Sequence, residues 1–324
     1  MRSSILFSTI LLLSLINQCL SIEYLDINQF IMMGKYHQFY AVNTTTGELI
    51  KNVDAGKQNY FFQSFLSGNP FTNSFLLLAT DQNDQQDVIL EYSINDNTFT
   101  EINRINDSYS GLANAQMYAY DPVHNFVALP TVDMNEQNLT IYIWDFNTKQ
   151  ITYVSLPYAP MNGNTLYPVG SYDATTGNYY IIYNIDEPKL RLGTYLVVYN
   201  MWTRTIVKEP VYFYDFVMQV PQIVYTNDQI YFIDLCLVCN FKIYTADPPT
   251  QSTKNIYTVP AKFKQSNNFG STFGVKGSSI VLFSSVTSEI YTTTVIDLAT
   301  MQIHTSPSIA MTNTFQYEWI SGGF

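Results

Sequence analysis

A short polar signature recurs along the whole chain, and it restricts the possible folds more than any other feature. In each copy a small polar residue is followed three positions later by Thr or Asp, and three positions after that by an apolar residue. The plainest copy lies within 144–151, and a looser one surrounds Asp247. The polar, turn and apolar positions of the five clear copies are Asn43/Thr46/Leu49, Ser93/Asp96/Phe99, Asp145/Thr148/Ile151, Asn200/Thr203/Ile206 and Asp297/Thr300/Ile303.

The signature predicts a tight turn between two antiparallel strands. Asn, Asp, Ser and Thr side chains bond the local backbone and stabilise such a reversal. Gly47, directly after Thr46, has no Cβ and adopts the positive φ that these turns often need. The copies follow one another at about fifty residues, a spacing typical of repeat architectures.

Between the turns the chain is rich in β-branched and aromatic runs, and none shows sustained helical periodicity. Such runs predict an all-β chain with about four short strands per repeat. In the clearest repeat we expect a turn at 121–125. Its strands are expected at 116–120, 126–129, 140–144 and 151–155.

Repeats of four antiparallel strands resemble the blades of a six-bladed β-propeller. The resemblance is architectural: it covers 22–324, and no Trp-Asp, paired-glycine or Tyr-Trp-Thr-Asp repeat is present. It implies one domain whose C-terminal segment, near 314–320, supplies the innermost strand of the first blade and removes exposed edges. A pair of β-sandwiches is the alternative fold. The expected units are roughly 22–54 plus 311–324, 55–105, 106–157, 158–212, 213–260 and 261–310.

The N-terminal segment, residues 1–21, predicts a secretory signal peptide, since Arg2 precedes an apolar run over 5–16 and the small residues Cys19 and Ser21 follow. A non-cleaved anchor is the alternative, although the run is too short for a membrane span. We therefore expect a monomer that is secreted or held in the endomembrane lumen. A net charge of −11 disfavours nucleic acid and anionic membranes as partners.

Export affects how the remaining cysteines and the sequons are interpreted. Cys236 and Cys239 flank a predicted hairpin tip, and an oxidising compartment favours a structural disulfide over a redox pair. Across a tight turn two Cα atoms come within disulfide range, whereas along an extended strand they do not. The sequons at Asn43, Asn106 and Asn138 are candidate glycosylation sites.

No enzyme motif and no catalytic residue can be identified from the sequence. The three histidines lie in separate repeats, which argues against zinc, and His124 is predicted as a solvated turn residue rather than a catalytic base. The segment 81–87 alternates oxygen ligands as a calcium loop does. However, Gln86 and Tyr92 occupy the positions of the required glycine and acidic residue, which favours a plain solvated loop.

The propeller resemblance implies that the connections between second and third strands of all blades lie on one face. In this chain these connections are richer in carboxylates than the sequence as a whole, and the connections between blades carry aromatics such as Tyr214 and Phe216. Such a face suits a small cation, a basic peptide or a sugar, with ordinary surface composition as the alternative. The candidate ligand or metal residues are Asp81, Asp87, Asp133, Asp186, Asp234 and Glu289.

These observations lead to a first hypothesis of a secreted binding or interaction protein. The alternative is a metal-assisted hydrolase or lactonase, in which converging carboxylates hold a divalent cation such as Ca²⁺. A purely structural extracellular role is the third possibility.

Overall fold

The structure is a computed structural model. It describes residues 29–34, 38–43, 49–54, 59–69, 74–93, 96–105, 119–121, 123–133, 138–156, 168–187, 190–218, 221–234, 241–258, 272–276, 279–287, 290–305, 309–310 and 320–321. Within these ranges the chain is all-β, and the helical structure is one 3₁₀ turn, Pro248–Thr250. The expected all-β class is therefore confirmed.

The described strands form antiparallel sheets, and each sheet is built from strands consecutive in sequence, apart from β25. The first sheet has the order β25 (Ile320–Ser321), β1 (Gln29–Gly34), β2 (Gln38–Asn43), β3 (Leu49–Asp54). The second has the order β4 (Tyr60–Asn69), β5 (Ser74–Asp81), β6 (Asp87–Ser93), β7 (Thr98–Ile105). The third has the order β8 (Ala119–Asp121), β9 (Phe126–Asp133), β10 (Asn138–Asp145), β11 (Gln150–Leu156).

The remaining described strands follow the same plan. The fourth sheet has the order β12 (Val169–Asp173), β13 (Asn178–Glu187), β14 (Leu190–Asn200), β15 (Thr205–Tyr214). The fifth has the order β16 (Pro221–Thr226), β17 (Gln229–Asp234), β18 (Lys242–Asp247), β19 (Ser252–Thr258). The sixth has the order β20 (Thr272–Lys276), β21 (Ser279–Thr287), β22 (Ile290–Asp297), β23 (Ile303–Thr305), and β24 (Ile309–Ala310) also pairs with β22.

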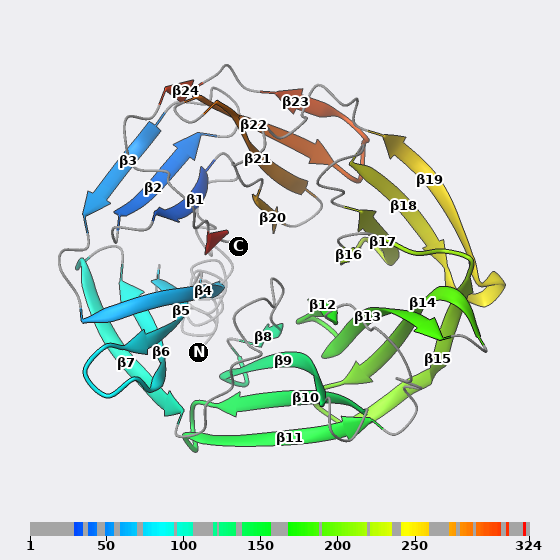
Figure 1. The fold of residues 1–324 in the computed structure, drawn as a ribbon, viewed down its shortest axis with the longest axis horizontal. Coiled ribbons are helices and arrows are strands. Elements are labelled where there is room, and N and C mark those ends of the chain that lie inside the picture. Colours follow the sequence, from blue (N-terminus) through cyan, green and yellow to red (C-terminus); the bar gives the residue numbers. More distant parts are fainter. Residues whose placement is uncertain are drawn as a thin grey trace, which may run out of the picture.

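The sheets are arranged around a ring (Figure 1). The innermost strands are β25, β4, β8, β12, β16 and β20, with β1 next to β25, and β3, β7, β11, β15, β19 and β23 lie at the rim. Because neighbouring strands are antiparallel, the second strand of every sheet runs towards the same edge of the ring. Strands are counted from the centre outwards. We call the edge that carries the connections from second to third strands the ligand edge. The opposite edge, which carries the hairpin turns before the second and fourth strands, is the turn edge.

The first sheet includes a strand from the far end of the sequence. Met33 and Met32 of β1 pair with Ile320 and Ser321 of β25. The expected closing strand near 314–320 overlaps this pairing at Ile320, while the rest of that segment lies outside the described residues.

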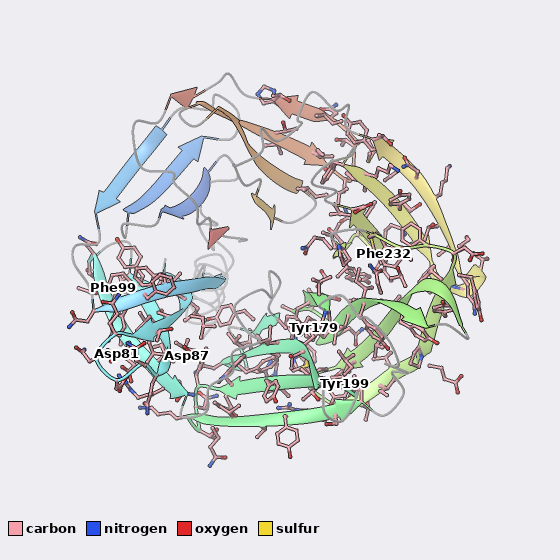
Figure 2. All side chains as sticks on the ribbon, in the orientation of Figure 1. Asp81, Asp87, Phe99, Tyr179, Tyr199 and Phe232 are labelled. Carbon is pink, nitrogen blue, oxygen red and sulfur yellow. The ribbon has the colours of Figure 1, made fainter. Side chains whose placement is uncertain are left out.

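Hydrophobic clusters fill the spaces between successive sheets from the second to the sixth, so the described central strands of the third, fourth and fifth sheets are buried on both faces. In β9, Ala128 packs against the fourth sheet, whereas Val127 and Leu129 pack against the second. In β13, Tyr179 (Figure 2) and Tyr183 pack in the cluster shared with the third sheet. This two-sided burial explains why 47% of the residues are hydrophobic and only 13% are charged.

The turn signature has one backbone feature in common across its described copies. The residue after the recurring Thr or Asp adopts a left-handed conformation, with φ between 54° and 57°. Before it, the polar side chain accepts backbone N–H groups: Asp145 Oδ1 accepts from Asn147 at 2.9 Å and Thr148 at 3.1 Å. These hydrogen bonds confirm the predicted turns. The left-handed residues are Asn97, Lys149, Arg204, Gln251 and Met301.

Aromatic rings lie over glycines on neighbouring strands of the fourth sheet. A Cβ added to Gly170 would come within 2.3 Å of the Tyr179 ring, and one added to Gly193 within 2.5 Å of the Tyr212 ring. Each glycine therefore provides the space that the adjacent tyrosine occupies.

Candidate functional site

The second strands of four consecutive sheets end in carboxylates at the ligand edge. Asp81, Asp133 and Asp234 are the last residues of β5, β9 and β17, and Asp186 is one residue from the end of β13. The topology thus brings these four positions to one edge, as the sequence predicts. Side chains are described for Asp81 and Asp234, which are only 7% and 6% exposed.

Asp87, at the start of β6, lies at the same end of the second sheet as Asp81 (Figure 2). Its Oδ1 accepts a hydrogen bond of 3.0 Å from Thr80 Oγ1. Glu289, the sixth candidate, lies outside the described residues.

Asp81 is held by an arginine that the sequence analysis did not single out. Arg104 on β7 contacts Asp81 Oδ2 at 3.0 Å and Glu101 Oε2 at 2.7 Å, and it also pairs with Asp84. The backbone N–H of Asn83 and the Arg104 guanidinium hold the pKa of Asp81 below its ordinary value. The cluster of three carboxylates and one guanidinium still carries net negative charge.

The loop over 81–87 is closed by its own hydrogen bonds. The Asp81 N–H donates to the Gln86 carbonyl and the Gln85 N–H donates to the Asp81 carbonyl, both at 2.8 Å. Asp84 Oδ1 accepts the Gln86 N–H at 3.1 Å. Since Arg104 also contacts Asp81 and Asp84, the loop is an ion-paired turn rather than the plain solvated loop expected from the sequence.

The connection from β15 to β16 brings aromatic residues to the ligand edge, but only one of the two predicted there is a surface platform. Tyr214 is 58% exposed. Phe216 instead packs against Phe232 and Tyr244, with ring centroids 5.7 and 4.9 Å away. Phe216 is therefore partly buried between the fourth and fifth sheets and is not the exposed platform predicted there.

The turn edge holds the most connected carboxylate among the described residues. Asp121 ends β8 and is 1% exposed. Its Oδ1 accepts the backbone N–H groups of Val123 and His124, both at 2.9 Å, and its Oδ2 lies 2.8 Å from His124 Nδ1. His124 is half exposed in the predicted turn, but this contact with Asp121 was not predicted.

Asp121 also joins the third sheet to the fourth. Its Oδ2 accepts hydrogen bonds from Tyr172 Oη at 2.7 Å and from Trp202 Nε1 at 2.8 Å. Burial alone would raise the pKa of Asp121, but the hydrogen bonds from Tyr172, His124 and Trp202 outweigh it, so the pKa is lowered. Burial and the bond to Asp121 raise the pKa of Tyr172. We call this group of four side chains the Asp121 junction.

Trp202 is fixed on its other side by the fourth sheet. A Cβ added to Gly177, whose φ is +73°, would lie 2.4 Å from the indole, so the ring rests directly on the glycine backbone. The His124 ring lies 4.9 Å from the indole. Sequence reasoning identified both turns but gave no signal that they meet, because Asp121 and Trp202 are far apart in sequence.

Several predicted features lie outside the described residues. They include the signal peptide, both cysteines, Asn106 and Gly47. Asn43 and Asn138 lie at strand ends, without described side chains. Among the described residues, no helix is long and apolar enough to cross a membrane. The same part of the chain contains no group of three or more His, Cys, Asp or Glu side chains that could hold a metal ion.

No family profile matches the sequence, and no curated protein matches it either. Many solved structures are similar to it, among them the following two. TolB from Acinetobacter baumannii superposes with a TM-score of 0.55 at 12% identity, over 91% of this chain and 66% of TolB. A chain of the nidogen/laminin complex superposes with a TM-score of 0.55 at 10% identity, over 90% of this chain and 98% of that one. Both are β-propellers, and at such low identity the likeness shows the fold alone: this chain has the architecture of a β-propeller.

Proposed function

We propose that this chain is an exported binding protein, a six-bladed propeller closed by its C-terminal strand, whose ligand edge takes a small cationic, basic-peptide or sugar ligand. The observation that carries the proposal is the placement of Asp81, Asp133, Asp186 and Asp234 at equivalent strand ends of four consecutive sheets. Carboxylates gathered at one edge reinforce one another's potential and attract cations in a salt-dependent way. The exposed ring of Tyr214 at that edge adds a surface for stacking or cation–π contact.

The test is to remove three of these charges together. Asp133→Asn, Asp186→Asn and Asp234→Asn in one protein should abolish binding of a hexalysine peptide or of CaCl₂, measured by titration calorimetry at low salt. Asp81 stays unchanged, because Arg104 already pairs with it. Unaltered binding by the triple variant would show that the ligand edge is not the binding surface.

The matched control removes three charges from the turn edge. Asp96, Asp228 and Asp247 are exposed and make local contacts in hairpin turns, for example Ser93 Oγ with Asp96 Oδ2 at 2.9 Å. Their triple Asn variant should bind like the wild type. Asp121 does not suit this purpose, because its loss would also disturb the junction between two sheets.

The alternative function, a metal-assisted hydrolase or lactonase, predicts a different result from the same proteins. A divalent cation bound at the ligand edge would then support hydrolysis of a lactone, and the triple variant would lose turnover together with the metal. Cation binding without turnover supports the binding protein.

Export, the disulfide and glycosylation are part of the proposal. Intact mass of the secreted protein, with alkylation before and after reduction, should show two thiols at Cys236 and Cys239 only after reduction. Enzymatic removal of N-glycans should lower the mass if Asn43, Asn106 or Asn138 is modified. Two free thiols in the native secreted protein would remove the disulfide from the proposal.

A further inference from the structure

Among the described strands, the outer strand of each sheet has no strand paired to its outer edge, and most of these outer strands are protected against pairing with another chain. Bulges, charged residues, proline and short length are the usual protections. β3, β7, β15 and β19 all combine a register shift with a lysine, arginine or glutamate, and β15 also contains Pro210. β23 has only three residues.

β11 has none of these protections. Its seven residues, Gln150–Leu156, pair with β10 in continuous register, and the strand contains neither a charge nor a proline. Tyr153, at its centre, is 70% exposed and lies beside Tyr142, with ring centroids 6.2 Å apart. Among the described outer strands, β11 alone offers a straight, uncharged edge with an exposed aromatic anchor.

The pairing register indicates which backbone N–H and C=O groups of β11 point away from β10. In the equivalent turn between β22 and β23, the Asp297 N–H donates to the Gln302 carbonyl at 2.9 Å. The same placement makes Asp145 and Gln150 a hydrogen-bonded pair. Hydrogen-bonded and non-hydrogen-bonded pairs alternate along an antiparallel ladder, so the N–H and C=O of Tyr153 point away from β10.

We propose that β11 is a docking site for an extended peptide segment of another protein, which adds a strand to the third sheet at the rim of the ring. The site is separate from the ligand edge. Main-chain hydrogen bonds to alternate residues supply affinity in this mode, and the Tyr153 ring supplies a side-chain contact.

Size and charge favour a peptide over a second copy of this chain. A seven-residue strand is about 23 Å long, and its edge alone buries far less than the roughly 800 Å² per partner of a stable interface between folded domains. Each copy carries a net charge of −11, so two copies repel each other at long range, whereas a segment with basic flanks is attracted. The segment is therefore an uncharged strand flanked by Lys or Arg.

A fluorescein-labelled peptide tests the site. Its centre repeats Thr140–Ile143 of β10, the neighbour with which β11 already pairs, and it has two lysines on each flank. Fluorescence anisotropy should show binding that weakens as salt is raised. The same peptide with N-methyl groups on alternate central residues should lose binding, because it cannot donate along the β11 edge, and this arm needs no protein variant.

Two substitutions at Tyr153 distinguish the backbone contribution to peptide binding from the side-chain contribution. Tyr153→Pro removes an outward N–H while leaving the bonds to β10, and it should weaken peptide binding about tenfold or more. Tyr153→Thr keeps the N–H and should weaken binding only a few-fold. Unchanged thermal unfolding of both variants confirms that the sheet is intact.

Three results would overturn the proposal. One is no binding of the peptide by the wild type, and another is equal binding of the N-methylated and unmodified peptides. The third is self-association of the wild type in analytical ultracentrifugation that increases with salt and disappears in Tyr153→Pro, which would make a second copy the occupant of the edge.

Discussion

The Asp121 junction should be a major stabilising contact between the third and fourth sheets. In Asp121→Ala, five donors lose their acceptor, including the Tyr172 hydroxyl and the Trp202 indole of the next sheet. Removing one member of a buried charged network typically costs about 3–5 kcal/mol. Trp202 is 42% exposed and can regain water, so we expect the lower end of that range, about 3 kcal/mol.

The size of the chain converts this loss into a measurable shift. Unfolding entropies of about 2 cal/mol/K per residue give roughly 0.6 kcal/mol/K for three hundred residues, so the Tm should fall by about 5 °C. Asp145→Ala is the matched control, because Asp145 caps the same kind of turn through Asn147 and Thr148 and has no described hydrogen bond to another sheet. It should cost about 1 kcal/mol.

A double-mutant cycle tests the contribution of the Tyr172–Asp121 hydrogen bond, which joins the third and fourth sheets. Stability is measured by scanning calorimetry and urea unfolding. Tyr172→Phe alone should destabilise by about 1.5 kcal/mol, since one hydrogen bond to a charged group is lost. In Asp121→Ala that bond is already absent, so the two effects should fall short of additivity by about 1 kcal/mol. Full additivity, or equal Tm values for Asp121→Ala and the Asp145→Ala control, would show that Asp121 does not stabilise the contact between the two sheets.

Three further results are expected. The lowered pKa of Asp121 stabilises the fold fully above about pH 5, and this contribution is lost as the pH falls through the folded pKa. In Asp121→Asn, the urea midpoint should therefore fall less steeply with decreasing pH in the acid range. A decrease as steep as that of the wild type would contradict this. Gly193→Ala would place a methyl group 2.5 Å from the Tyr212 ring and should cost about 1–3 kcal/mol by calorimetry, with much of the loss relieved by Tyr212→Ala in the same chain. Lys149 has φ of 56°, so Lys149→Gly should raise the free energy of unfolding by up to about 1 kcal/mol in urea titrations, whereas Thr148→Gly should lower it.

The sequence predicts the local geometry of this chain well, because the turn chemistry is encoded over a few residues. Asp145 and Thr148 identify a reversal, and the reversal fixes which strand ends reach the ligand edge. Placing Asp81, Asp133 and Asp234 at that edge follows from counting strands, and the structure agrees.

Contacts between elements distant in sequence could not be predicted in the same way. Arg104 lies on β7, outside the connections between second and third strands, so the sequence of those connections gives no sign of its pairing with Asp81. Tyr172 and Trp202 meet Asp121 only because two sheets pack face to face. Phe216 was assigned to the surface because the propeller resemblance places its connection on that face, whereas packing of the fourth sheet on the fifth partly buries the ring. In each case the position of the side chain depends on packing against residues distant in sequence, which no local sequence pattern encodes.

The pairing of β1 with β25 also affects when the fold can be completed. Met32 and Ser321 are almost three hundred residues apart, and ribosomes add about 5–20 residues per second. The inner edge of β1 therefore remains without this partner for roughly 15–60 s during synthesis. Over that time the sheets assembled from consecutive strands can form one after another, and the sheet that begins the chain is the last to be completed.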